Sequence, residues 1–205
     1  MKKHRRRNNR RKKSRISHLA LIIFIILAII LIGDVIGAII YLRQSSQIQE
    51  TLVEYMATGH SMSFFQIFWQ QFLYQLTIWT MGLSIIGIFI NLFLVFVRGI
   101  SAGFNLAILL QHDISTGILI LWLIHYLLIL FTTILGVYFS IRFAYLVVIS
   151  LVKKKHKLLK KYFKLYIVQF IVVVFFITLS SMLSAVVTPS IQDYLTENTP
   201  VRVDE

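Results

Sequence analysis

The sequence predicts an all-α fold, a polytopic membrane helix bundle of about five transmembrane helices with the N-terminus in and the C-terminus out. Hydrophobic residues make up 58% of the 205 residues, and charged residues 14%. A soluble domain of this size could not bury so much apolar side chain in one core, whereas a bilayer solvates it directly. The second observation is that Lys and Arg gather in blocks beside long apolar segments, which is typical of cytoplasmic connections.

Two basic blocks set the expected topology. Of the 21 Lys and Arg residues, ten lie in residues 1–18 and seven in residues 153–164, and the net charge is +13. We therefore expect a basic cytoplasmic tail and, further on, a Lys-rich cytoplasmic connection. Because topology explains both blocks, we expect no nucleic-acid partner. Attraction to the anionic headgroups of the lipid bilayer accompanies this interpretation.

Residues 19–42 are predicted to be the first transmembrane helix, since a predominantly apolar run of this length crosses the hydrocarbon layer with some tilt. No small-x-small cleavage site follows it, so it is interpreted as a retained helix and not a signal peptide. Asp34, between Gly33 and Gly37, is the one carboxylate in any apolar segment. A lone acid in the membrane is a functional candidate by default. The alternative is that Asp34 is protonated or hydrogen-bonded inside the bundle and fixes helix register.

Residues 43–75 are predicted to be an extracytoplasmic loop that is polar at first and then aromatic. Ser63 and Gln66 have the spacing of a capping box, and aromatic residues then recur every four positions along one helical face. This pattern fits an amphipathic helix on the outer membrane surface, or else the aromatic belt of the next span. Either way it is a candidate docking surface for a partner, comprising Phe64, Phe65, Phe68, Trp69 and Phe72.

Residues 76–190 are expected to hold four further helices. With both basic blocks inside and residues 43–75 outside, residues 76–152 must cross the membrane an odd number of times. One crossing takes about 20 residues, so three crossings fit. They are placed at residues 76–97, 99–111 and 123–151.

Arg98 is predicted to mark the cytoplasmic turn between the first two of these three crossings. The second, 99–111, is short, which leaves open whether it spans fully or whether residues 114–124 dip back as a re-entrant half-helix. A last span at residues 165–187 ends before Pro189, and residues 191–205 form an extracytoplasmic tail.

Small residues cluster at Gly82, Ser84 and Gly87, and again at Gly99 and Gly103 in a G-x-x-x-G arrangement. In lipid such residues let helix backbones approach closely, so they predict a packed membrane hairpin. Gly33 and Gly37 are further helix-packing candidates. The alternative is that glycine is simply common in membrane helices.

The remaining polar residues of the apolar segments are candidates for buried contacts. Asn91 and Asn105 would face each other across the Arg98 turn as interhelical hydrogen-bond partners. His125 lies at the same expected depth as Asp34, and a pair of the two could relay protons. Arg142 is expected to reach the cytoplasmic interface, with a partner inside the bundle as the alternative.

No enzyme chemistry is predicted from these residues. The sequence has no cysteine, no H-E-x-x-H motif and no second intramembrane aspartate to pair with Asp34, so we expect no catalytic residue, cofactor or metal. Ser84 with His125 invites comparison with intramembrane serine proteases. However, the glycine that usually follows such a serine is absent, and a serine among glycines more often serves helix packing.

Three blocks carry a resemblance to a known family: Trp79 to Gly87, Val97-Arg98-Gly99 with Gly103-Phe104, and Ser184-Ala185 with Thr188-Pro189. Together they resemble the stage II sporulation protein M family, from about Phe64 to Leu195. The resemblance implies a five-span membrane protein with its amino terminus inside. It also implies a scaffold that anchors two cell-wall hydrolases during engulfment.

One motif of the family is altered here. Many relatives have Leu-Pro-His-Gly followed by a glutamate at the start of the fourth span, whereas this chain has Leu123-Ile124-His125-Tyr126 and no acid after it.

Two functions follow from the sequence. The first is a non-enzymatic scaffold of the bacterial plasma membrane that anchors or regulates extracytoplasmic peptidoglycan-remodelling enzymes or other membrane proteins. The second is a transporter or permease subunit, for which a polar cavity reaching Asp34, Asn105 and His125 would be required.

Overall fold

The computed structural model describes residues 2–58, 62–112, 114–152 and 156–198, and all regular structure in these ranges is helical. The helices are α1 (Lys2–Leu42), α2 (Ser46–Thr58), α3 (Phe64–Met81), α4 (Ile86–Gln111), α5 (Thr116–Val152) and α6 (His156–Asn198). The predicted all-α class is confirmed.

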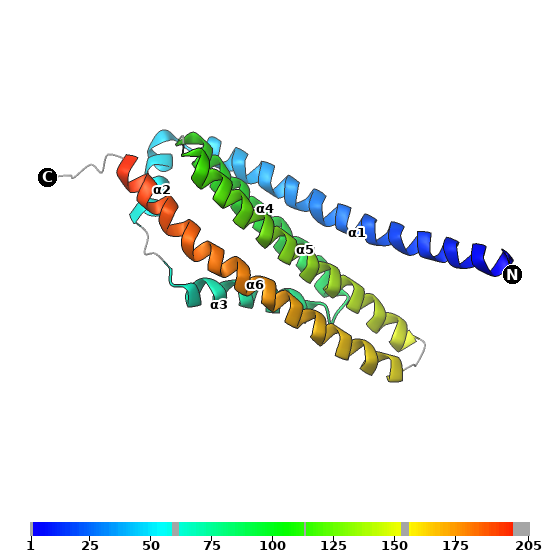
Figure 1. Ribbon diagram of the computed structural model, residues 1–205. Coiled ribbons are helices and arrows are strands. Elements are labelled where there is room, and N and C mark those ends of the chain that lie inside the picture. The colour runs from blue at the N-terminus through cyan, green and yellow to red at the C-terminus, as the bar shows by residue number, and fades with distance from the viewer. Residues whose placement is uncertain (1, 59–61, 113, 153–155, 199–205) are drawn as a thin grey trace.

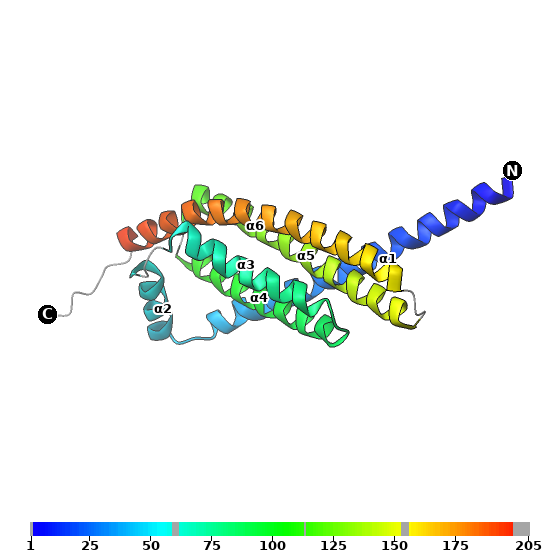
Figure 2. The same ribbon diagram turned by 90° about the horizontal axis from the view of Figure 1, so that it is seen from below.

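Five of these helices run along the long axis of the molecule, and the short helix α2 packs at one end of it (Figures 1 and 2). We call the end that holds α2 the outer end, and the end that holds the α3–α4 turn and the α5–α6 connection the inner end. Chain direction alternates through α3, α4, α5 and α6, whereas α1 and α4 run parallel to each other toward the outer end. The first residue of α1 and the last of α6 therefore lie at opposite ends (Figure 1).

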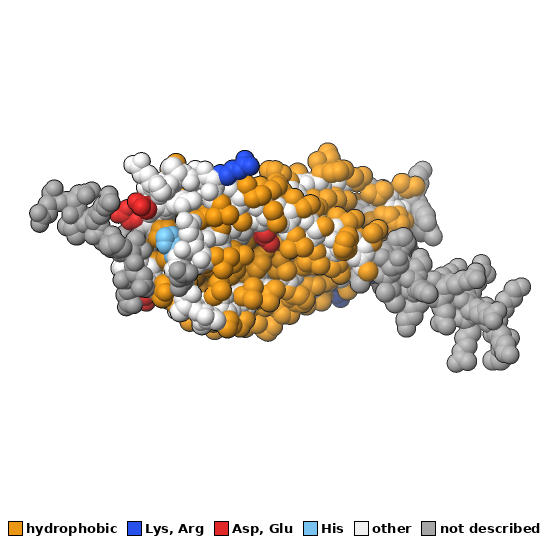
Figure 3. Space-filling model, turned by 90° about the horizontal axis from the view of Figure 1, so that it is seen from above, with side chains coloured by type: hydrophobic (Ala, Val, Ile, Leu, Met, Phe, Trp, Pro, Cys, Tyr) orange, Lys and Arg blue, Asp and Glu red, His pale blue; other side chains and the backbone are white. Residues whose placement is uncertain are grey.

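Four of the helices are long and apolar enough to cross a membrane. They comprise Ala20–Leu42, Ile86–Gln111, Thr116–Ser150 and Tyr162–Thr196. Their outward side chains form a broad apolar belt (Figure 3). Helix α3 is shorter and carries several glutamines, and it is not among the four, yet it runs alongside α4, α5 and α6 from the outer to the inner end (Figure 2). The polytopic membrane bundle that the sequence predicts is confirmed.

The predicted turn at Arg98 is wrong. Arg98 lies in the middle of α4, which continues from Ile86 to Gln111 without a break. At 26 residues this helix is about 39 Å long, enough to cross the hydrocarbon layer alone. The inner turn lies earlier, at residues 82–85, where the Ser84 hydroxyl accepts a hydrogen bond from the Gly87 N–H (2.9 Å) and so caps the start of α4.

Two open questions about boundaries are also answered. Residues 116–152 form one continuous helix, so the start of this segment is not a re-entrant half-helix. Residues 43–75 hold two helices and not one: α2, and the first part of α3, which starts at the predicted capping box of Ser63 and Gln66. The aromatic run thus belongs to a helix packed along the bundle, where Phe72 contacts Phe170 of α6 with ring centroids 6.0 Å apart.

The basic segments extend the spanning helices. Residues 2–18 continue α1 without interruption, and they project past the bundle at the inner end (Figure 1). The Lys-rich connection is shorter than predicted, because α6 already begins at His156; residues 153–155 lie outside the described ranges. Helix α6 likewise continues to Asn198, and the rest of the predicted tail, residues 199–205, lies outside them.

Candidate functional site

The most extensive helix–helix contact in the described bundle joins α1 to α4 through two facing G-x-x-x-G pairs. A Cβ atom at Gly33 would lie 2.6 Å from the carbonyl oxygen of Phe96 and 3.1 Å from the Cα of Gly99. A Cβ at Gly99 would lie 2.5 Å from the carbonyl oxygen of Ile30. Since any side chain here would collide with backbone, only glycine permits this approach. We call this contact the glycine seam.

The outer half of the glycine seam is closer still. A Cβ at Gly103 would overlap the carbonyl group of Asp34, and a Cβ at Gly37 would overlap that of Ile100. The pairing of Gly99 and Gly103 is therefore with α1 and not within a hairpin around residues 82–87. Its consequence is that the backbone of Asp34 is fixed against α4 in the middle of the membrane.

The side chain of Asp34 reaches across to α5. The Tyr126 hydroxyl donates to the carboxyl group, with oxygen–oxygen distances of 2.8 Å to Oδ2 and 3.0 Å to Oδ1. An ionised aspartate at the centre of a spanning helix costs about 2.5–3.5 kcal/mol on the insertion scale, and an interhelical hydrogen bond recovers about 0.6–2 kcal/mol. The contact that the sequence suggested with His125 is made instead by the next residue in the chain.

Arg98 lies one turn of α4 inward from this contact. Its guanidinium carbon is 4.4 Å from the centre of the Tyr74 ring of α3, and the Tyr74 hydroxyl donates to the carbonyl of Leu94 (3.1 Å). A cation over an aromatic face contributes about 2 kcal/mol when both are desolvated. Arg98, Tyr126 and Thr133 also line one small cavity of about the size of a water molecule between α1, α4 and α5.

The other outer polar candidates do not join this group. The Nε2 atom of His125 is buried and has no hydrogen-bond partner in the described part of the chain. Asn105 is half-buried on α4, about 21 Å along the same helix from Asn91, so the predicted pair of asparagines facing each other is wrong.

Asn91 instead ties three helices together at the inner end. Its Nδ2 donates to the carbonyl of Ile78 on α3 (3.1 Å) and to Ser140 Oγ on α5 (2.6 Å). A Cβ at Gly82, in the adjacent turn, would overlap Ser140 and the hydroxyl of Tyr166. Interhelical amides of this kind act as polar glue in lipid.

The aromatic residues around this contact stack closely. The Tyr166 hydroxyl of α6 donates to the carbonyl of Trp79 (2.7 Å), and its ring stacks on Phe143 of α5 with centroids 4.1 Å apart. The inner ends of α3, α5 and α6 are therefore held together as firmly as the glycine seam holds α1 and α4.

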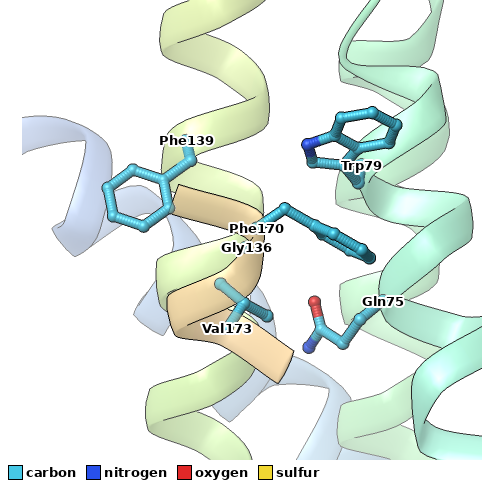
Figure 4. A pocket seen from close by; sticks show the side chains of 6 residues that line it. All are labelled: Gln75, Trp79, Gly136, Phe139, Phe170 and Val173. Atoms are coloured by element: carbon cyan, nitrogen blue, oxygen red, sulfur yellow. The ribbon is translucent and has the colours of Figure 1, made fainter. Parts of the chain in front are cut away.

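A third polar contact runs between α3 and α6. Ser180 Oγ donates to Gln71 Oε1 (2.6 Å). One turn further inward Gln75, only 3% exposed, faces Gly136 and a small cavity that Trp79 and Phe170 also line (Figure 4). Gln75 Oε1 and Trp79 Nε1 have no hydrogen-bond partner among the described residues.

Helix α2 packs across the outer end of the bundle. Val53 is fully buried in a cluster with Tyr41 and the outer parts of α4, α5 and α6. Gln49 donates to the carbonyl of Tyr41 (3.1 Å) and accepts from Gln111 Nε2 (3.0 Å). The surface of α2 away from this cluster is exposed, with Tyr55 77% exposed.

The remaining candidates lie apart from one another. Ser84 is exposed in the inner turn, where its hydroxyl caps α4, whereas His125 lies in the outer part of α5. Arg142 is exposed near the level of the inner turn, not buried as the alternative had it. Of the described residues, no group of three or more His, Asp and Glu side chains could hold a metal ion.

The predicted aromatic candidates divide into two faces of α3. Phe65 and Trp69 stack on each other (6.5 Å) and are 68% and 49% exposed. Phe68 and Phe72 are half-buried toward the bundle, and Phe64, at the outer rim, is 40% exposed.

Two residues that sequence reasoning missed are central to the polar group. Tyr126 was not singled out, although a tyrosine hydroxyl in an apolar helix calls for a hydrogen-bond partner. Arg98 was interpreted as a turn residue because a lone cation in an apolar run usually marks a helix end.

Long apolar helices, a glycine seam and polar contacts between helices define this molecule as a polytopic membrane protein. The sequence profile of Stage II sporulation protein M (SpoIIM) matches residues 19–189, from the start of the apolar part of α1 to Pro189 in α6. The chain belongs to this family. No curated protein and no solved structure matches it significantly.

Proposed function

We propose that this protein is a non-enzymatic scaffold of the bacterial plasma membrane that anchors or regulates extracytoplasmic peptidoglycan-remodelling enzymes. The observation that carries the proposal is the ordered helix α2 on the outer end of the bundle. The positive-inside rule puts the basic residues 1–18 and the Lys-rich segment in the cytoplasm, and hence α2 outside.

Helix α2 is suited to docking because it is held from below and free above. A helix of 13 residues is marginal alone in water, so its order comes from the buried Val53 and the hydrogen bonds of Gln49. A preordered surface loses little conformational entropy when a partner binds. Its exposed face combines the apolar Ile48 with Tyr55 and Glu50, the mixture of aromatic anchor and polar rim that partner sites use.

The exposed aromatic pair on α3 extends this surface toward the membrane. Phe65 and Trp69 lie in the first turns of α3, near the outer end. Aromatic residues at that level anchor a helix at the headgroups, which would hold a docked enzyme close to the membrane.

The proposal is tested by site-specific photo-crosslinking in cells. A photoreactive amino acid at Tyr55 is expected to capture a cell-wall hydrolase, identified by mass spectrometry, and one at Phe65 is expected to capture the same protein. The matched control is Phe175, which is equally apolar and 65% exposed but lies in the lipid-facing part of α6. Absence of hydrolase adducts at Tyr55, or equal adducts at Phe175, contradicts the proposal.

The transporter function is not proposed. It required a polar cavity reaching Asp34, Asn105 and His125, and none of these residues lines either of the two small cavities described above.

A further inference from the structure

We propose that Asp34 is a proton-binding site of the bilayer interior, held protonated in the resting protein and reactive from the lipid phase. The proposal concerns α1, α4 and α5 and is independent of the scaffold function.

The first step of the argument is position. Asp34 lies near the middle of the apolar segment Ala20–Leu42, and the overlap of its carbonyl with Gly103 fixes it to the middle of α4. Neither helix can slide to bring the carboxyl group to water without breaking the glycine seam. Figure 3 shows an acidic side chain surrounded by the apolar belt, and Asp34 is the acid of the described spans.

The second step is the set of groups that face the carboxyl group. From α5 the Tyr126 hydroxyl donates to both oxygens, and the neighbouring His125 leaves its Nε2 without a partner in the described chain. From α4 the nearest cation is Arg98, which is turned to the ring of Tyr74 on α3. No Lys, Arg or His of the described residues forms an ion pair with Asp34.

The third step is what these groups can support. A carboxylate in lipid requires a cation or several donors, whereas Asp34 has one hydroxyl donor. A neutral acid requires only that its two oxygens and one O–H be accommodated, and its half-exposed surface can face lipid at low cost. Proton binding at this position therefore favours the contact of α1 with α5, and proton release would place an unpaired charge against lipid.

The test is labelling with carbodiimides in native membranes. The protonated acid adds its O–H across one C=N bond of the reagent, the proton goes to nitrogen, and acyl migration leaves a stable acylurea with no group lost. A lipid-soluble reagent, dicyclohexylcarbodiimide, is expected to modify Asp34, as read by peptide mass spectrometry. A water-soluble carbodiimide with an added amine is expected to modify the exposed Glu50 of α2 and to leave Asp34 unmodified, so the chain supplies its own control.

Two further measurements complete the test. Labelling of Asp34 is expected to fall about tenfold per pH unit above the midpoint of titration, because only the protonated fraction adds to the reagent. Tyr126→Phe should remain labelled and shift that midpoint, whereas a structural role alone predicts no pH dependence. Labelling of Asp34 by the water-soluble reagent, or no labelling by the lipid-soluble reagent in protein that is folded by gel filtration, overturns the proposal.

Discussion

Replacing Gly103 with alanine is predicted to separate α1 from α4. A Cβ at this position would lie 2.6 Å from the Cα of Asp34, whereas carbon atoms in contact prefer about 3.5–4.0 Å, so the helices must part by about 1 Å. That displacement lengthens the Tyr126–Asp34 hydrogen bond, now 2.8 Å, beyond its useful range. Overpacking costs about 1–3 kcal/mol and a lost interhelical hydrogen bond about 0.6–2 kcal/mol, so we expect Gly103→Ala to destabilise the protein by about 2–4 kcal/mol.

The assay is reversible unfolding in mixed micelles, with the midpoint of denaturation by dodecyl sulfate as the readout. Gly117→Ala is the matched control, because a Cβ at Gly117 in the first turn of α5 meets nothing within 4 Å. The control should be neutral or slightly stabilising, since alanine favours a helix over glycine by about 0.5–1 kcal/mol. If both variants unfold at the midpoint of the parent protein, the close approach in the glycine seam does not exist in the folded molecule.

Three further predictions concern the polar contacts and the topology. Tyr126→Phe should lower stability by about 0.6–2 kcal/mol in the same unfolding assay, and an unchanged midpoint would show that the hydroxyl makes no contact with Asp34. Asn91→Leu removes the donor to Ile78 and Ser140 and should cost about 1–3 kcal/mol, with Asn105→Leu, which makes no such contact, as the control. Because the sequence has no cysteine, single cysteines report topology directly: in inverted membranes an impermeant thiol reagent should label Ser84→Cys and not Arg98→Cys, and the reverse pattern would restore the turn at Arg98.

The spans were predictable because their signal is local. Hydrophobic length identified α1, the outer part of α4, α5 and α6, and the capping box at Ser63 identified the start of α3. Which helix packs on which could not be predicted in the same way. The G-x-x-x-G at Gly99 marks a surface for close packing but does not name its partner, and that partner lies on α1, far away in sequence.

Arg98 shows why the candidate site was predicted only in part. A lone arginine among apolar residues has the local pattern of a helix end, and its true neighbour, Tyr74, lies on another helix. Likewise Asp34 was identified from its own chemistry, but the donor to it could not be, because His125 and Tyr126 differ by only 100° around α5. Depth along a span can be counted from sequence, whereas rotation about the helix axis is set by packing.

The parallel pairing of α1 with α4 has a consequence for biogenesis. The ribosome delivers α1 to the bilayer well before Gly99, Gly103 and Tyr126 have been synthesised, so Asp34 must wait in the lipid without the surfaces that accommodate it. Nascent chains that stop before α5 would expose that acid indefinitely, and they should be recognised by membrane chaperones and proteases. Completion of α5 is in this sense the step that releases the newborn chain from surveillance.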